Sequence, residues 1–200
     1  MKYLEIRPQL KTGDCLLFDG KGHISELIKR ISRGPWSHIA MVVVVNEFNI
    51  VGLWESTMLS TQADLDSGQY RKGVQFVDLS ARLRGYEGRI AVRQLEKPLD
   101  SVQLKRLARL RHEFKDRPYE RNMIELARSA YDGFLGNNRE ESLASLFCSE
   151  LFAEGYQRME LLPEVPYGLP SNEYTPSDFG ECRDLQLLDN RLGPEIEIEV

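Results

Sequence analysis

The sequence has few of the features that mark a specialised class of protein. Its 200 residues include three cysteines and three histidines, and its longest apolar run, Ile39 to Val45, has seven residues. So few cysteines, odd in number, do not form a disulfide framework and fit a reducing compartment. The apolar run is far shorter than the about 20 residues that span a bilayer. The N-terminal residues show no apolar signal-peptide core. We therefore expect a cytoplasmic protein without a transmembrane segment.

Charge of neither sign dominates. The chain has 26 Lys and Arg residues against 31 Asp and Glu residues, which gives a formal net charge of −5. This balance provides no overall basic surface for a phosphate backbone, so we expect no nucleic-acid partner. Hydrophobic residues make up 42% and charged residues 28%, as in ordinary globular proteins. The length suggests one domain over residues 1–200.

Several catalytic motifs are also missing. The histidines and cysteines show no H-x-x-x-H or C-x-x-C spacing, and no G-x-S-x-G segment occurs. We therefore expect no metal, no cofactor and no serine-hydrolase site. Residues 20–25 approximate the dinucleotide-binding pattern G-x-G-x-x-G, but Ser25 replaces the third glycine. Since no further alternation of strands and helices follows, we reject a nicotinamide-dinucleotide site.

Hydrophobic patterning predicts strands mostly in the first half of the chain and helices mostly in the second. The expected strands are 15–18, 38–45, 50–56, 74–79 and 89–95, and the expected helices are 24–31, 102–115, 123–131 and 151–159. Residues 163–176 are rich in Pro and Gly and should be irregular. The tail 194–200 alternates Ile and Glu, as in an edge strand or a frayed end. This order indicates an α+β fold.

Cys148 is the leading candidate nucleophile. It lies within Phe147-Cys148-Ser149, at the predicted start of the last long helix. A helix N-terminus favours an anion and lowers the pKa of a cysteine thiol. The backbone N–H of Cys148 would then be one oxyanion donor. The alternative is a buried structural thiol, which is our interpretation of Cys15 and also of Cys182, although Cys182 lies in a charged, loop-like stretch.

His38 is the best placed base for this cysteine. It begins the apolar strand 38–45, where an imidazole on a sheet can face a helix. We expect His23 at the start of a helix and His112 on a charged helical face, both at the surface. A histidine satisfied within the core remains the alternative for His38.

Glu55 is the candidate to orient the imidazole, and strand register supports it. If strands 38–45 and 50–56 form a hairpin, a two-residue turn places Glu55 directly opposite His38. A four-residue turn places it one diagonal step away on the same face. A register shifted by one residue would move Glu55 to the other face. The alternative is a surface acid at the end of a strand.

These residues belong to an ordered set of segments that resembles a known family. The set comprises Gly13-Asp14, Trp36-Ser37-His38-Ile39-Ala40-Met41-Val42, Trp54-Glu55-Ser56, Phe147-Cys148-Ser149-Glu150-Leu151 and Thr175-Pro176-Ser177-Asp178-Phe179. It resembles the circularly permuted branch of the NlpC-type papain-like superfamily, and within it the YiiX/YebB-like group. The resemblance extends over roughly residues 12–180.

The resemblance implies a permuted papain-like fold, with helices packed against an antiparallel sheet and with the histidine ahead of the cysteine. It assigns the family's histidine to His38, its polar third member to Glu55 and its cysteine to Cys148. A tyrosine that often lines the family's substrate site falls on Tyr119, for which an ordinary half-buried tyrosine is the alternative. The irregular segments 57–73 and 132–145 are candidates for shaping the cleft.

The implied activity is hydrolysis of amide bonds. Family members cleave peptides, often of the cell wall, and lecithin:retinol acyltransferase-like relatives handle lipid acyl groups. The chain shows no signal peptide and no wall-binding module, which argues against peptidoglycan. Our hypothesis is a cysteine peptidase or amidase that acts through a thioester on a small peptide-like or amide substrate. The alternatives are an acyl-lipid or thioester hydrolase or acyltransferase with the same triad, and a non-catalytic ligand-binding module. The oligomeric state stays open.

Overall fold

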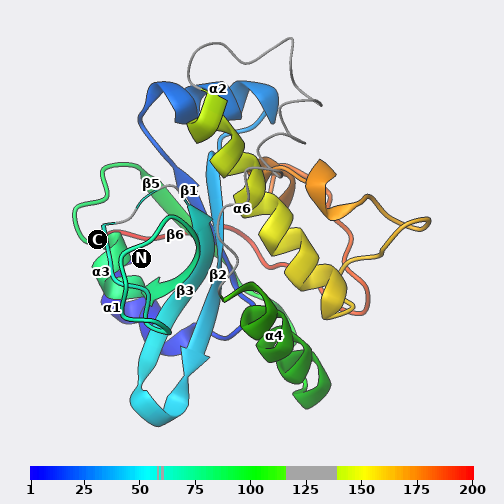
Figure 1. The fold of residues 1–200 in the computed structure, drawn as a ribbon. Helices are drawn as coiled ribbons and strands as arrows, with labels where there is room; N and C mark the ends of the chain where they lie inside the picture. Colours follow the sequence, from blue (N-terminus) through cyan, green and yellow to red (C-terminus); the bar gives the residue numbers. More distant parts are fainter. Residues whose placement is uncertain (58, 60, 116–138) are drawn as a thin grey trace.

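The computed structural model describes residues 1–57, 59, 61–115 and 139–200, and of Ile24 and residues 139–146 it describes the backbone alone. In these residues six strands form one antiparallel sheet in the order β4-β3-β2-β1-β5-β6 (Figure 1). The strands are β1 (Cys15–Asp19), β2 (His38–Val45), β3 (Ile50–Thr57), β4 (Gly73–Asp78), β5 (Arg89–Arg93) and β6 (Ile196–Glu197). The α+β class with an antiparallel sheet is therefore confirmed.

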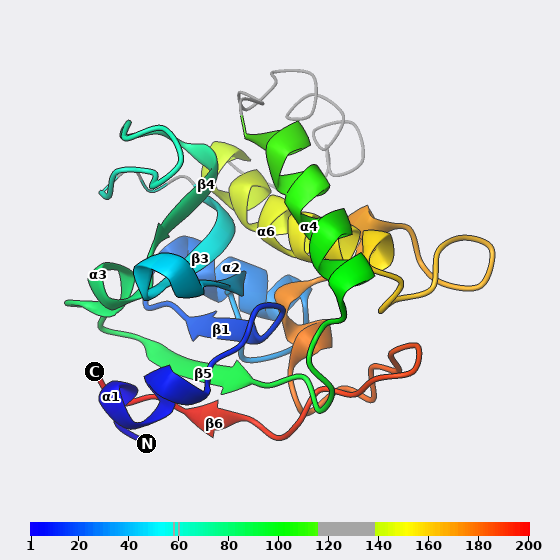
Figure 2. The same ribbon diagram turned by 90° about the horizontal axis from the view of Figure 1, so that it is seen from below.

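Helices cover both faces of this sheet (Figure 2). The described helices are α1 (Tyr3–Ile6), α2 (His23–Ile31), α3 (Leu79–Leu83), α4 (Ser101–Phe114) and α6 (Arg139–Arg158), with 3-10 turns η1 (Arg7–Gln9), η2 (Asn46–Phe48), η3 (Ser171–Glu173) and η4 (Pro176–Phe179). The start of α4 is fixed by Asp100, whose carboxylate accepts hydrogen bonds from the N–H groups of Val102 and Gln103.

Alternation along the strands divides the core into two clusters. Ile39 and Met41 of β2 pack on one face with α4 and α6, whereas Ala40 and Val42 pack on the other with α1 and α3. Both faces are therefore buried, which explains why residues 38–45 read as one uninterrupted apolar run. Apolar burial on both sides holds the central strands in place for the groups that they carry.

Most predicted elements occur close to their expected positions. The strand expected over 74–79 ends at Asp78 instead. The side chain of Asp78 accepts a hydrogen bond from the N–H of Ala81 and so starts α3. The tail forms an edge strand, since β6 pairs with β5. The helix expected over 123–131 lies outside the described residues.

The N-terminal residues and the C-terminal tail lie side by side (Figure 2). The amino group of Met1 donates to the carbonyl of Glu197, and the N–H of Tyr3 donates to the carbonyl of Glu199. The order β1-α2-β2 resembles a dinucleotide-binding unit in sequence only, because β1 and β2 are antiparallel neighbours.

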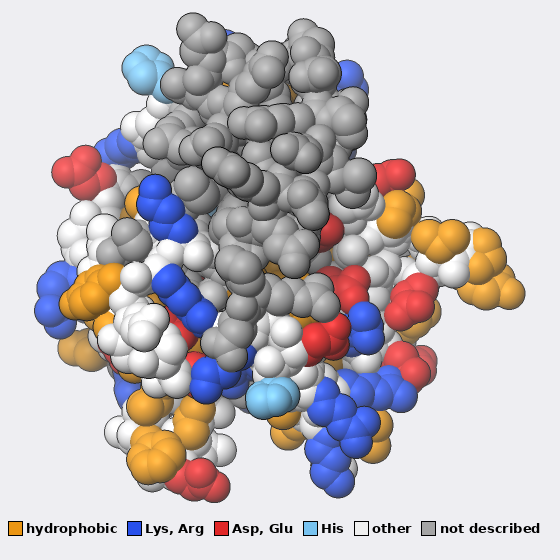
Figure 3. Space-filling model, in the orientation of Figure 1, with side chains coloured by type: hydrophobic (Ala, Val, Ile, Leu, Met, Phe, Trp, Pro, Cys, Tyr) orange, Lys and Arg blue, Asp and Glu red, His pale blue; other side chains and the backbone are white. Residues whose placement is uncertain are grey.

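In the view of Figure 3, acidic and basic side chains are interspersed over the part of this face that is not grey. None of the helices in the described part of the chain combines the length and the apolar character needed to cross a bilayer.

Candidate active site

The imidazole of His38 and the carboxylate of Glu55 form a close pair near one end of the sheet. His38 Nε2 and Glu55 Oε2 are 2.6 Å apart. The Glu55 side chain is fully buried, and that of His38 is 15% exposed. The contact leaves the other ring nitrogen, Nδ1, available to a second partner.

The hairpin register explains why these two residues meet. β2 and β3 pair Met41 with Trp54 and Val45 with Ile50, so residues 46–49 connect the strands. Asn49 takes a left-handed backbone conformation with φ of 50° at the end of this turn. Continuing the register places Glu55 one diagonal step from His38, on the same face. Of the two turn lengths considered, the structure therefore has the longer one.

Two further side chains hold the Glu55 carboxylate, and the sequence analysis did not identify either. The Nε2 of Gln75 donates to Glu55 Oε1 over 3.0 Å, and the Nε of Arg82 donates to the same oxygen over 3.1 Å. Gln75 faces Glu55 directly across the β3–β4 pair, so extending the register argument to the third strand would have found it. Arg82 comes from α3, and no local sequence pattern distinguishes it from the other arginines.

Cys148 completes the group from the helical layer. It is buried on α6, and it makes a hydrogen bond with His38 that favours the charged imidazole. By strand alternation His38 lies on the face of Ala40 and Val42, whereas α6 packs on the opposite face. Because His38 is the first residue of β2, the thiol and the ring meet where the strand begins. The structure thus brings together Cys148, His38 and Glu55.

The position of Cys148 within its helix differs from the prediction. α6 begins at Arg139, so Cys148 lies in the helix interior and not in its first turn. The N–H of an interior residue is bonded to the carbonyl four residues earlier and is not free to serve an oxyanion. The dipole effect of a helix terminus is confined to the first turn, so it does not act on Cys148. Both expectations based on a helix start at Cys148 were wrong.

Neighbouring groups set the charges of His38 and Glu55. Burial disfavours the imidazolium, but Cys148 and the Glu55 carboxylate outweigh it and raise the pKa of His38 to about 9. Burial likewise disfavours the Glu55 carboxylate, but Arg82, His38 and Gln75 lower the pKa of Glu55 to about 2. At neutral pH a charged imidazole therefore lies between the Glu55 carboxylate and the sulfur of Cys148.

Of the other candidate residues, Cys15, His23 and His112 lie as predicted, the prediction of a buried thiol was wrong for Cys182, and Tyr119 lies outside the described part. Cys15 is fully buried in β1, and burial raises the pKa of its thiol well above the usual range. Cys182 is exposed. His23 begins α2 and His112 lies on α4, and both are exposed. Tyr119 lies outside the described residues, so its role at the site remains a prediction.

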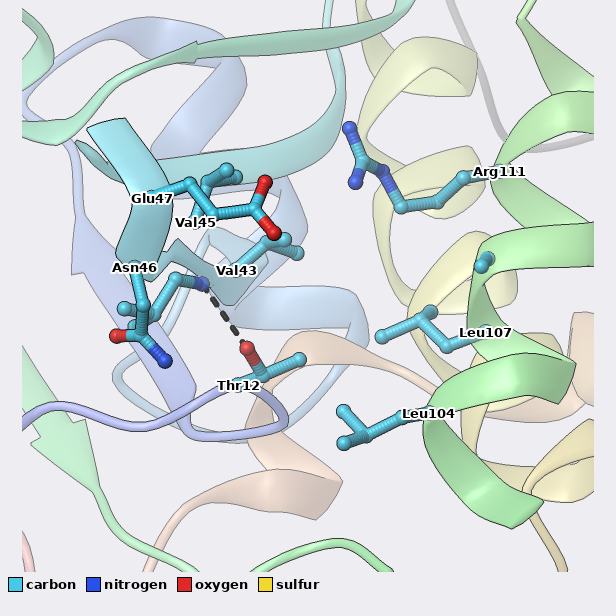
Figure 4. A pocket seen from close by; sticks show the side chains of 10 residues that line it. Thr12, Val43, Val45, Asn46, Glu47, Leu104, Leu107 and Arg111 are labelled. Carbon is cyan, nitrogen blue, oxygen red and sulfur yellow. Dashed lines mark hydrogen bonds between the residues drawn. The ribbon is translucent and has the colours of Figure 1, made fainter. Parts of the chain in front are cut away.

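Within the described residues, no three His, Cys, Asp or Glu side chains come together as metal ligands. One cavity of about 280 Å³ lies between β2 and α4, lined among others by Val43, Leu107 and Arg111 (Figure 4). It adjoins the end of β2 at Val45, about 23 Å along the strand from His38 at a rise of about 3.3 Å per residue. This cavity is therefore separate from the candidate site.

Comparison with solved structures supports the fold. Over 96% of this chain and 97% of the other, the structure is similar to that of the metalloprotein yiiX from Escherichia coli O157:H7, with a TM-score of 0.50 and 18% sequence identity. No family model and no curated protein matches the chain. At this identity the similarity concerns the fold alone. It agrees with the sequence resemblance to the YiiX/YebB-like group at that level.

Proposed function

We propose that the chain is a cysteine hydrolase that cleaves amide bonds, with Cys148 as nucleophile, His38 as base and Glu55 as the group that orients the imidazole. The observation that carries this proposal is the continuous chain of contacts from the Cys148 thiol through His38 to the buried Glu55 carboxylate. A nucleophile, a base and an orienting acid in this order are the minimum that acyl transfer to a thiol needs.

The first half of the reaction forms a thioester. His38 Nδ1, protonated in the resting pair, holds the proton given up by Cys148, and the thiolate sulfur bonds to the substrate's carbonyl carbon. The carbonyl electrons move to oxygen, giving a tetrahedral intermediate. When that intermediate collapses, the carbon–nitrogen bond breaks and the imidazolium returns its proton to the departing amine. The acyl group is then held on Cys148 as a thioester.

The second half returns the free enzyme. His38 takes a proton from a water molecule as the water oxygen bonds to the thioester carbon. The carbon–sulfur bond breaks, the acid product leaves, and the thiolate sulfur again lies beside the imidazolium, as at the start. In both halves Glu55 accepts the hydrogen bond from Nε2 and stabilises the imidazolium, which fixes the ring orientation that the sulfur requires.

A substrate panel with mass-spectrometric detection of the covalent intermediate tests the proposal. Acyl amides, esters and thioesters that share one acyl group are incubated with the protein, and the acylated residue is located by peptide mapping. We expect amide turnover, with the acyl group on Cys148. Cys148→Ala should abolish turnover and leave the circular-dichroism spectrum unchanged. Cys182→Ala should leave turnover unchanged.

The outcome also separates the proposed activities. Turnover of esters or thioesters without amides would assign the acyl-lipid or thioester chemistry to the same residues. Full turnover by the Cys148→Ala variant would refute the assignment of the nucleophile. Binding of substrates without any acylation of Cys148 would indicate a ligand-binding module and would contradict the proposal.

A further inference from the structure

We infer that Arg82 is a positioning residue, which keeps the Glu55 carboxylate charged and directed at His38 and so sets the lowest pH at which Cys148 is reactive. This inference rests on the proposed function, because it concerns the same three residues. Arg82 acts through Glu55, whose Oε1 accepts a hydrogen bond from the Arg82 Nε.

The two oxygens of Glu55 have separate partners. Oε2 faces His38 Nε2, while Oε1 accepts from both Arg82 and Gln75. Since the Glu55 side chain has no exposed surface and the Arg82 side chain is 10% exposed, water contributes little to stabilising this charge. A carboxylate buried without a cation takes up a proton. Arg82 is therefore the permanent counter-charge that lets the orienting residue stay ionised.

Aromatic rings fix the guanidinium in this position. Its central carbon lies 5.0 Å from the centre of the Phe18 ring and 5.8 Å from that of the Tyr86 ring. The Phe18 ring also contacts the His38 ring, with centroids 5.4 Å apart. A flat guanidinium stacks on such rings and directs its N–H groups along fixed lines, which an ammonium group does not do. Phe18 thus contacts both His38 and Arg82, and Arg82 is the residue that keeps Glu55 charged.

The groups that face Glu55 come from three elements and the segment after α3. His38 reaches it from β2, Gln75 from β4 and Arg82 from α3, and Tyr86 follows α3. Burial raises the pKa of Tyr86 to about 12, so this group carries no charge near neutral pH. After burial, which opposes ionisation, Arg82 has the largest influence on the lowered pKa of Glu55.

Loss of Arg82 should therefore raise the lowest pH at which Cys148 is reactive. Without the cation, burial makes Glu55 take up a proton at a higher pH. The neutral carboxyl group no longer stabilises the imidazolium, and the thiolate of Cys148 loses its counter-ion in turn. An opposite charge within about 4–6 Å changes the pKa of a carboxyl group by about one to three pH units. We expect the acid limit of Cys148 reactivity to rise by about one pH unit or more.

The test measures alkylation of Cys148 by iodoacetamide as a function of pH, with peptide mass spectrometry as the readout. It needs no substrate, and a Cys182→Ser background removes the exposed thiol. The acid limit should rise in Arg82→Gln and should stay near the wild-type value in Arg82→Lys, which keeps the charge. Arg111→Gln is the matched control: Arg111 stacks on Phe76 at 4.2 Å and pairs with Asp66 at 3.1 Å, and its removal should leave the acid limit unchanged.

Two further variants keep the inference falsifiable. If Arg82→Gln does not fold, Arg82→Met fills the space beside the two rings without a charge and should show the same rise. In a Glu55→Gln background, Arg82→Gln should change the acid limit no further, because no carboxylate remains to be charged. A folded, neutral Arg82 variant with the wild-type acid limit would overturn the inference and leave the proposed function intact. A wild-type Cys148 no more reactive than an ordinary buried thiol would overturn both.

Discussion

Removing the Cys148 sulfur should lower the pKa of His38, and the size of the change measures how closely the two residues are coupled. In the intact protein the pKa of His38 is raised from 6.5 to about 9 although burial opposes the charged ring. The difference corresponds to about 3 kcal/mol of net preference for the imidazolium. Cys148 and Glu55 together supply this preference and also offset the cost of burial.

In Cys148→Ala only Glu55 remains to oppose burial. Loss of one opposite charge in direct contact should lower the pKa of His38 by about one to two pH units. The substitution removes one sulfur atom from a buried site and leaves the His38–Glu55 contact in place. The change in the His38 titration therefore reports the lost charge and not a rearranged ring.

Proton NMR of the imidazole C–H groups, recorded from pH 5 to 10, is a suitable assay because the chain has three histidines. His23→Gln and His112→Gln assign the two exposed rings by loss of their signals. An identical His38 titration in the two proteins would refute the coupling of sulfur and imidazole, and with it the proposed nucleophile–base pair.

Two further predictions concern stability. Because the pKa of Glu55 is lowered from 4.5 to about 2, its ion pairs stabilise the fold fully above about pH 4.5 and progressively less as the pH falls toward 2. Urea unfolding should show this loss for the wild type and a flatter pH dependence for Glu55→Gln; equal slopes would contradict the linkage. Phe152→Ala, which removes a buried ring 4.4 Å from Tyr156, should cost about 3–5 kcal/mol in urea unfolding. The exposed Leu4→Ala should change it by less than about 0.5 kcal/mol, and a similar loss in both would contradict the packing argument.

The sequence was sufficient to predict the central hairpin and the two site residues that it carries. Either of the two turn lengths considered places Glu55 on the same face as His38, so their proximity follows from counting along two strands. Arg82 could not be found in this way. Its contact with Glu55 depends on how the short helix α3 packs across the sheet, which is tertiary information absent from any local pattern.

The start of α6 shows a different limit of sequence interpretation. Its first residues, Arg139-Glu140-Glu141-Ser142, are polar and add nothing to an apolar stripe. Apolar spacing becomes visible only further along, so the predicted helix started too late and Cys148 was placed at a terminus. The pairing of Cys148 with His38 was predicted nonetheless, because it depends on which elements carry the residues and not on the exact helix boundary.

The proposed nucleophile and the proposed base belong to different layers of the molecule, since Cys148 lies on α6 and His38 on β2. Strand pairing holds His38 and Glu55 together, whereas side-chain contacts hold the helix, and with it the sulfur, against the sheet. A small separation of helix from sheet would disconnect the thiol while every strand stayed paired. We therefore expect the reactivity of the Cys148 thiol to depend on the contact between α6 and the sheet, and to be lost before the sheet itself unfolds.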